Sequence, residues 1–241
     1  MGTVAQRAEV KPGAGWQRFR AWFGQRARVF LPVIYAWDES QTLRNVETVR
    51  NVGADGVFLI NHGMGYQGLL RITAAAISKH GPRFVGVNCL DLRTHELIRR
   101  LPDGVAGVWS NDVPALGAEP ETVDALDHAR RMRHWDGLLL APLITGEAAA
   151  ASGAAETRLS VDVPTIVGRG IGSSEEVDVV RSVSESIGEA PLAIAAGVDS
   201  DYVDQVLPFV NCVMTAARGN EKLEEVDQDE ARRLSDKVHT S

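Results

Sequence analysis

Eight short apolar runs, separated by longer stretches with helical spacing, constrain the fold of this 241-residue chain more than any other feature. The runs are rich in aliphatic and β-branched residues, as buried parallel strands are. They lie at 29–36, 56–61, 84–89, 105–110, 137–144, 164–168, 191–196 and 211–216. The stretches between and after them predict helices near 39–52, 66–80, 94–101, 120–134, 174–188, 200–208 and 227–238. Repeated strand–helix units of this kind predict a parallel sheet.

The number of these units predicts a single (β/α)₈ TIM barrel rather than an open, doubly wound sheet. Such barrels begin near about 200 residues, and residues 28–241 supply eight units. An open dinucleotide-binding sheet would carry a Gly-rich phosphate loop after its first strand, but Trp37-Asp38-Glu39 follows it here. We therefore predict one barrel domain over 28–241, preceded by an extension over 1–27. The crossover at 145–163 has a poor helical pattern, which leaves open whether it is a helix or a long loop.

Residues 16–28 form a basic, amphipathic segment within that extension. Trp16, Phe19 and Trp22 recur at helical spacing, with arginines between them. One interpretation is a short helix whose aromatic side chains close one end of the core or join a subunit interface. The other is a surface for a membrane or an acidic partner. No run approaches the roughly 20 apolar residues of a membrane span, so we expect a soluble protein without membrane association.

The charge and the scarcity of two residue types exclude several function classes. The net charge of −7 gives no general electrostatic basis for binding nucleic acid, so no such partner is expected. Cys89 and Cys212 lie far apart without a metal-binding spacing, which predicts a reduced, cytoplasmic protein with neither a disulfide scaffold nor a metal or cofactor. The chain has only four lysines, none of them within a predicted strand. A Schiff-base aldolase is therefore not expected.

Polar side chains follow several predicted strands, at the end of a barrel where active sites are built. His62 is predicted to be a general acid or base, or else a hydrogen-bonding loop histidine. Asp91 and Asp112 follow neighbouring strands and are predicted to form an acid–base pair. The same positions also suit Mg²⁺ ligands, although no spacing is diagnostic of a metal. Without a ligand, Asp91 would cap the helix that begins at 94, and Asp112 would form an Asx turn before Pro114. Asn61 and Asn88 end their strands and are predicted to orient polar groups of a ligand.

A Gly-rich loop at 168–174 enters a predicted helix and indicates an anion site. Glycine lets backbone N–H groups approach a ligand, and a helix N-terminus favours negative charge. A flexible turn with a capping box from Ser173 to Glu176 explains the same loop without a ligand. Because the last βα loops of many barrels share a phosphate site, two segments near the C-terminus join the prediction. The predicted anion-binding residues are Arg169, Gly170, Gly172, Gly197, Arg218 and Gly219.

Four segments resemble the BtpA family of TIM-barrel proteins. Gly86-Val87-Asn88-Cys89-Leu90 resembles the GVNVL segment of that family, and Thr145-Gly146-Glu147-Ala148 resembles its TG-containing loop. Ala196-Gly197-Val198-Asp199 is similar to its GSGVT turn, and Val226-Asp227 to its closing VDxxR segment. Strand one lacks the histidine and the Pro-Gly-Ser-Pro loop of the family. The resemblance covers most of 28–238 and implies a divergent member with a TIM barrel related to phosphate-binding barrels.

Together these features predict an enzyme that binds a phosphorylated sugar, a nucleotide or a related small anion at the carboxyl ends of the strands. Isomerase, lyase and glycosyl-transfer chemistry are all compatible with the predicted acid–base residues. The alternative is a noncatalytic binding or assembly protein of the BtpA type that uses residues 16–28 as an interface. We also expect a homo-oligomer, in which the same segment could complete the core of a neighbouring subunit.

Overall fold

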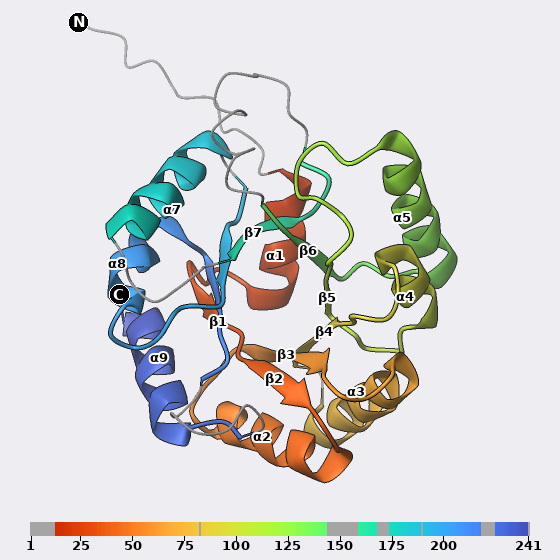
Figure 1. The fold of residues 1–241 in the computed structure, drawn as a ribbon, viewed down its shortest axis with the longest axis horizontal. Helices are drawn as coiled ribbons and strands as arrows, with labels where there is room; N and C mark the ends of the chain where they lie inside the picture. Colours follow the sequence, from red (N-terminus) through yellow and green to blue (C-terminus); the bar gives the residue numbers. More distant parts are fainter. Residues whose placement is uncertain are drawn as a thin grey trace, which may run out of the picture.

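The computed structural model describes residues 13–81, 83–143, 159–167, 174–188, 190–217 and 225–240, with only the backbone given at 174 and 175. Within these ranges the strands form a central parallel barrel, and the helices that follow them form an outer ring (Figure 1). The strands are β1 (Val29–Phe30), β2 (Val33–Ala36), β3 (Gly56–Asn61), β4 (Phe84–Asn88), β5 (Gly107–Trp109), β6 (Leu138–Pro142), β7 (Val163–Val167), β8 (Ala193–Ala195) and β9 (Cys212–Met214). The helices are α1 (Ala14–Phe23), α2 (Glu39–Asn51), α3 (Tyr66–His80), α4 (Thr94–Arg100), α5 (Pro120–Arg133), α7 (Ser174–Ser186), α8 (Val203–Val206), the 3₁₀ helix η1 (Leu207–Phe209) and α9 (Gln228–Thr240).

The barrel closes because the first predicted strand pairs on both of its sides. Its first part, β1, pairs with β9, and its second part, β2, pairs with β3, both in parallel. The amide of Leu31 donates to the carbonyl of Val213 at 2.9 Å, and that of Val33 donates to the carbonyl of Thr215 at 3.0 Å. The pairing with β9 therefore continues from β1 to the start of β2. Pro32 has no amide hydrogen to donate and interrupts the strand at this point. If β1 and β2 are counted as one strand, the nine strands make an eight-stranded barrel.

Two hydrophobic layers hold the barrel together. The larger one lies between the strands and the helices, and Ile34, Leu59 and Val87 belong to it. The other fills the interior of the barrel with the side chains at alternating strand positions, among them Val33 and Phe58. This alternation is the period of two expected for strands that are buried on both faces. The interior is therefore a packed core rather than a channel.

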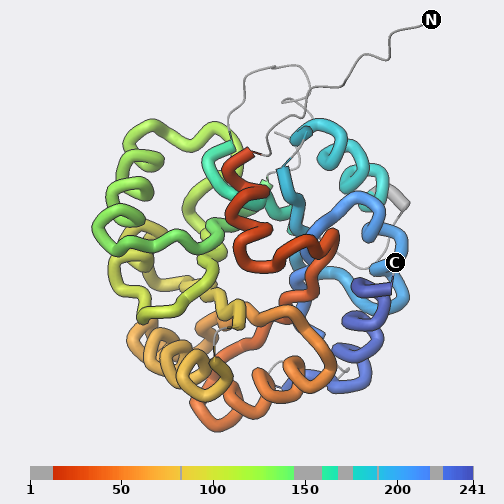
Figure 2. The backbone as a smooth tube through the Cα atoms, turned by 180° about the vertical axis from the view of Figure 1, so that it is seen from behind, coloured from red at the N-terminus to blue at the C-terminus, as the bar shows by residue number. Residues whose placement is uncertain are grey.

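Helix α1 closes the amino end of the barrel and crosses it from one side to the other (Figure 2). Phe19 and Phe23 are buried in the interior core, where the ring of Phe23 lies 5.0 Å from that of Phe84. Gly15 permits this close approach, since a Cβ atom there would lie 2.3 Å from the carbonyl oxygen of Asp162. Arg18 also pairs with the Asp162 carboxylate, at 2.6 Å. The aromatic side of the 16–28 segment thus packs on the barrel of its own chain.

The structure confirms the strand–helix order that the sequence predicts and changes some of its boundaries. The strand predicted at 56–61 and the helix predicted at 66–80 coincide with β3 and α3. The helix predicted at 200–208 is instead the short α8 followed by η1, because Pro208 cannot donate the hydrogen bond that would continue an α-helix. Most of the crossover at 145–163 lies outside the described residues. Among the helices that are described, none is long and apolar enough to cross a membrane.

Candidate functional site

The carboxyl end of the barrel is lined by larger polar and aromatic side chains than the interior below it. Tyr35 and Asn88 continue the inward-facing alternation of β2 and β4, and Ile60 and Trp109 pack against the interior core from β3 and β5. Tyr35, Ile60 and Trp109 are partly exposed, whereas Asn88 is buried. We call this end of the barrel the mouth. Since α1 covers the opposite end, the mouth is where the loops after the strands can reach a ligand.

Asn88 and Asn111 form a reciprocal pair of amides at the mouth. The Nδ2 of Asn88 donates to the Oδ1 of Asn111 at 3.2 Å, and the Nδ2 of Asn111 donates to the Oδ1 of Asn88 at 2.9 Å. Asn88 is 1% exposed, whereas Asn111 is exposed to solvent. Each amide fixes the orientation of the other and keeps further donor and acceptor capacity. The pair can therefore present an oriented amide edge to a polar ligand.

Asn61 is used to tie two loops together. Its Oδ1 accepts a hydrogen bond from the amide of Leu90 at 2.8 Å, and its Nδ2 donates to the carbonyl of Met64 at 3.1 Å. The side chain is 2% exposed. These contacts link the loop after β3 to the loop after β4, so Asn61 shapes the mouth through the positions of those loops.

His62 belongs to an aromatic cluster on the rim of the mouth. Its ring centroid lies 5.2 Å from that of Trp37 and 5.6 Å from that of Tyr35. Gly63 has a φ of +77°, and a Cβ atom at this position would lie 2.9 Å from the Trp37 ring. Glycine is therefore needed for the backbone conformation and for the close packing of the indole. Both His62 and Trp37 are exposed, so the cluster offers an exposed indole with an imidazole beside it.

Asp112 caps helix α4 from the loop after β5. Its carboxylate accepts hydrogen bonds from the backbone amide of Thr94 at 3.1 Å and from the hydroxyl groups of Thr94 and Ser110. The two hydroxyl groups also bond to each other, at 2.7 Å, and both residues are buried. The carboxylate thus satisfies donors at the N-terminus of α4, a helix that the sequence predicts Asp91 to cap.

Replacing Asp112 with alanine is expected to lower the free energy of unfolding by about 1–2 kcal/mol. The loss follows because the buried hydroxyl and the amide of Thr94 lose their acceptor. Urea denaturation followed by tryptophan fluorescence measures it. Asp91→Ala is the matched control, since Asp91 is exposed like Asp112 but accepts no hydrogen bond from Thr94, and it should change stability by less than about 0.5 kcal/mol. Equal effects of the two substitutions would contradict a capping role for Asp112.

Asp91 lies on the rim beside the loop after β3. Its Oδ2 would be 3.8 Å from a Cβ atom built on Gly65, which places the carboxylate next to the start of α3. Within the described residues, Asp91 and His62 make no hydrogen bond or ion pair with one another. The structure therefore brings Asn88 to Asn111 and Asp91 to the loop after β3, but it does not pair His62 with either aspartate.

Only part of the predicted anion site can be placed. Gly197, directly after β8, has a φ of +64°, and the preceding Ala196 has a φ of +61°. Two successive left-handed residues make a sharp turn there. Asp199 accepts hydrogen bonds from the amides of Asp201 and Tyr202, so its side chain closes an Asx turn directly before α8. Five predicted anion-binding residues lie outside the described residues, namely Arg169, Gly170, Gly172, Arg218 and Gly219.

The cysteines do not supply a nucleophile. Burial raises the pKa of the Cys89 thiol and raises that of Cys212 still more, so both are protonated at neutral pH. Both are free thiols, with no disulfide between them. In the part of the chain that the structure describes, no group of three or more His, Cys, Asp or Glu residues is arranged to hold a metal ion.

Two residues of the mouth, Tyr35 and Trp109, are not among the residues predicted from the sequence. Each lies inside a strand, whereas the predicted site residues follow the ends of strands. The available signal is the alternation, because Tyr35 is two residues from the interior residue Val33, and Trp109 is two residues before Asn111. A large aromatic side chain at the last inward position of a strand reaches the mouth of a barrel.

A closed barrel of parallel strands, surrounded by helices and with polar residues at the carboxyl ends, is a TIM barrel, and this confirms the predicted fold class. The chain is similar to a solved structure of tryptophan synthase from M. tuberculosis, with a TM-score of 0.66, 12% identity, and coverage of 95% of this chain and 99% of the other. It is also similar to a structure from Aquifex aeolicus VF5, with a TM-score of 0.63, 13% identity, and coverage of 94% and 99%.

A third similar structure is the 4-hydroxy-2-oxoglutarate aldolase/2-deydro-3-deoxyphosphogluconate aldolase from TTHB1. Its TM-score is 0.60, its identity is 15%, and the match covers 87% of this chain and 94% of the other. No protein-family model and no curated protein sequence matches this chain. At these identities the structural likenesses establish the fold alone.

Proposed function

We propose that this chain is a TIM-barrel enzyme that binds a small phosphorylated molecule with a ring, such as a sugar phosphate or a nucleotide, at the mouth. The observation that carries the proposal is the placement of the Asn88–Asn111 amide pair at the same end of the barrel as the aromatic cluster of Tyr35, Trp37 and His62. An oriented amide edge suits the hydroxyl or base edge of a ligand. A half-exposed indole suits the face of its ring.

The phosphate in this proposal rests on the predicted anion loops and on one structural neighbour. The aldolase neighbour has a phosphogluconate derivative in its name. In this chain, Arg169 and Arg218 would hold the phosphate beside the turn at Gly197. Schiff-base chemistry is not part of the proposal, since none of the four lysines lies in a predicted strand. Lys79 and Lys237 lie on the outer helices α3 and α9, and Lys11 and Lys222 lie outside the described residues.

His62 is the residue that we propose for proton transfer. It is exposed at the mouth, and imidazole is the side chain that most often serves as a general acid or base. Asp91 remains the candidate for a second acid–base group, because it lies on the same rim. Asp112 is a weaker candidate than it is from sequence alone, since its carboxylate already serves the donors of Thr94 and Ser110. Isomerase, lyase and transferase chemistry remain the proposed reaction classes.

We further propose a cytoplasmic protein, in keeping with its two free thiols. The alternative is a noncatalytic assembly protein that uses residues 16–28 as an interface. The packing of that segment gives this alternative less support than the sequence does. Phe19 and Phe23 are buried in the barrel core, and Trp22 packs edge-on against Phe84 at 5.7 Å. The aromatic side of the 16–28 segment is therefore already covered, which leaves less apolar surface there for a partner.

Thermal unfolding with ribose 5-phosphate tests the proposed ligand class. At about 100 times the Kd, a bound ligand should raise the Tm by roughly 5–10 °C. Trp37→Ala should weaken binding about tenfold through the lost ring contact, and Arg169→Gln should weaken it at least as much. Arg232→Gln, an exposed position on α9, is the control and should leave the Kd unchanged. Equal Tm shifts with ribose 5-phosphate in the wild type and both mouth variants would contradict the proposed site.

A further inference from the structure

One side of the mouth, formed by β2 to β5, carries a row of four inward-facing side chains. Tyr35 is paired in register with Ile60, and Ile60 with Asn88. The register of β4 and β5 sets Asn88 level with Trp109. The loops after these four strands are fully described, in contrast to those after β6, β7 and β9. We call this part the β2–β5 side of the mouth; in its lining, aliphatic and aromatic side chains flank one amide.

The indole of Trp37 is exposed at the edge of this row and is held in place by its neighbours. Trp37 directly follows β2 and is 39% exposed. Its ring packs beside that of His62 and closely against the backbone of Gly63. Its backbone amide donates to the Oε1 of Gln41 at 3.3 Å. An aromatic ring that is both exposed and ordered loses little conformational entropy when a flat ligand stacks on it.

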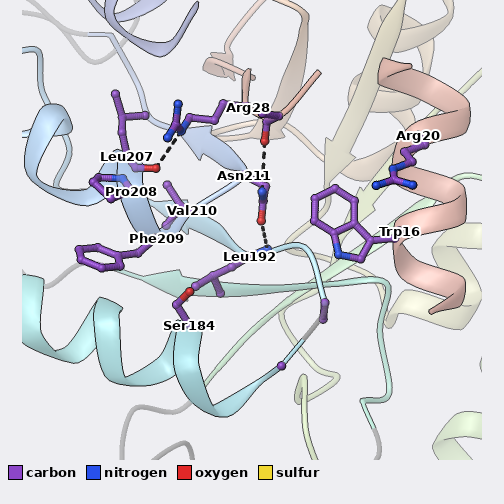
Figure 3. Close-up of a pocket in the computed structure, with 13 residues that line it drawn as sticks. Trp16, Arg20, Arg28, Ser184, Leu192, Leu207, Pro208, Phe209, Val210 and Asn211 are labelled. Carbon is purple, nitrogen blue, oxygen red and sulfur yellow. Dashed lines mark hydrogen bonds between the residues drawn. The ribbon is translucent and has the colours of Figure 1, made fainter. Parts of the chain in front are cut away.

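The amides of the mouth differ in their partners from an amide at the opposite end of the barrel. A cavity of about 500 Å³ lies there beside α1, and the side chain of Asn211 in its wall bonds to the backbone of two other segments, as donor and as acceptor, both at 3.1 Å (Figure 3). Asn211 thus holds chain segments together. Asn88 and Asn111 instead bond to each other, apart from a long contact of 3.5 Å between the Nδ2 of Asn111 and the carbonyl of Cys89. A ligand can therefore replace part of the bonding of this pair without releasing a chain segment.

The β2–β5 side of the mouth suits a nucleobase better than a sugar ring. A sugar carries a hydroxyl group on most of its carbons, and each hydroxyl group that leaves water needs a partner. Of the aspartates that follow these strands, Asp38 caps α2 and Asp112 caps α4, which leaves Asp91 as an acceptor. A base has two apolar faces and one polar edge. An aromatic side chain can cover such a face, and an asparagine amide can bond to the edge through its donor and its acceptor.

We propose that the β2–β5 side of the mouth binds the base of a nucleotide, with the base stacked on Trp37 and its edge hydrogen-bonded by the Asn88–Asn111 pair. This inference rests on the proposed function and narrows its ligand from a phosphorylated ring compound to a nucleotide. Two strand spacings, about 10 Å, separate β2 from β4, so side chains from these strands can reach the face and the edge of one base. The net charge of −7 favours a free nucleotide over a nucleic acid strand.

Isothermal titration of the full-length protein with adenosine 5′-monophosphate, uridine 5′-monophosphate and ribose 5-phosphate tests the inference. At least one nucleotide should bind about tenfold more tightly than ribose 5-phosphate, which is the usual gain when one base stacks on an aromatic ring. Asn111→Ala, at an exposed position, should raise the Kd of that nucleotide about fivefold, and by a larger factor than that of ribose 5-phosphate. Met132→Ala is the control for the loss of an exposed apolar side chain, since Met132 lies on α5, and should leave each Kd unchanged.

Two substitutions of Trp37 test the stacking itself. Trp37→Ala should raise the Kd of the nucleotide about tenfold, and Trp37→Phe, which keeps an aromatic ring, should restore most of the lost affinity. Equal Kd values for the two variants would contradict stacking on this residue.

The three ligands separate a failure of this inference from a failure of the proposed function. If ribose 5-phosphate and both nucleotides bind with the same Kd, and Asn111→Ala changes all three by the same factor, the base site is overturned while a phosphorylated ring ligand stands. If none of the three binds at millimolar concentration, the proposed function is overturned as well.

Discussion

Replacing Asp162 with alanine is expected to lower the free energy of unfolding by about 3–5 kcal/mol, because it leaves buried charge without a partner. The Asp162 side chain is 7% exposed and pairs with Arg130 at 2.7 Å and with Arg18 at 2.6 Å. It also accepts a hydrogen bond from the buried amide of Leu139 at 2.8 Å. Arg130 is itself only 12% exposed, so it cannot recover this interaction from water. The carboxylate thus joins α1, α5 and β6.

Thermal unfolding measures the effect, and for a chain of this length the Tm should fall by roughly 10 °C. Asp103→Ala is the matched control, since Asp103 pairs with Arg133 at the same distance of 2.6 Å but is 93% exposed. An exposed pair contributes about 0–1 kcal/mol. Asp162→Asn keeps an acceptor for Leu139 and should be intermediate. A Tm loss no greater for Asp162→Ala than for Asp103→Ala would show that burial does not strengthen the pair.

Nothing in the local sequence marks Asp162 as a key residue. It lies at the end of a crossover with a poor helical pattern, and its partner Arg18 is 144 positions away. The sequence around Arg18 instead suggests a basic surface. The four arginines of 16–28 lie close together in sequence, whereas the groups with which they pair are distant in sequence. In the structure Arg18 pairs with Asp162, Arg26 with Asp55 and Arg28 with a backbone carbonyl. Ion pairs between residues that are far apart in the sequence cannot be predicted from the local sequence around either residue.

The strand order could be predicted because a parallel barrel repeats one local pattern. Each strand of the barrel is buried on both faces, so it appears as a continuous apolar run. The exception is instructive, since Pro32 lies within the first run and interrupts it. Its carbonyl still accepts a hydrogen bond from Phe58 at 2.9 Å, and this contact keeps the interrupted strand in the sheet. A proline in a strand therefore changes the hydrogen bonding without changing the topology here.

The sequence predicts where the polar residues of the candidate site lie in the barrel, but it does not predict what each side chain contacts. Residues directly after the strands do gather at the mouth, as the barrel topology requires. Whether such a residue faces a ligand or its own loops depends on partners that are distant in sequence. The carboxylate of Asp112 accepts a hydrogen bond from the amide of Thr94, and the side chain of Asn61 accepts one from the amide of Leu90. Asn88, by contrast, is hydrogen-bonded to the amide of Asn111 in the loop after β5, and the local sequence does not separate this case from the other two.

Replacing Phe58 with alanine is expected to lower the free energy of unfolding by about 3–5 kcal/mol, the usual loss for a fully buried aromatic side chain. Phe58 is 0% exposed and lies in the barrel interior, with its ring 5.6 Å from that of Phe84 and 6.4 Å from that of Trp109. It fills the space that Gly86 leaves empty on the next strand. A Cβ atom on Gly86 would lie 2.3 Å from Phe58 Cε1, so the two residues are complementary in shape.

This complementarity predicts that the two positions are coupled. Gly86→Ala in the wild type should cost about 1–3 kcal/mol, because the Phe58 ring cannot move away from a new methyl group. In the Phe58→Ala background the same substitution should cost less by about 1 kcal/mol or more, since the methyl group enters the cavity left by the ring. Urea denaturation of the four proteins gives the coupling energy. Gly13→Ala, where a Cβ atom meets nothing within 4 Å, is the control and should show no coupling to Phe58. Additive effects of Gly86→Ala and Phe58→Ala would show that the ring does not pack on this glycine.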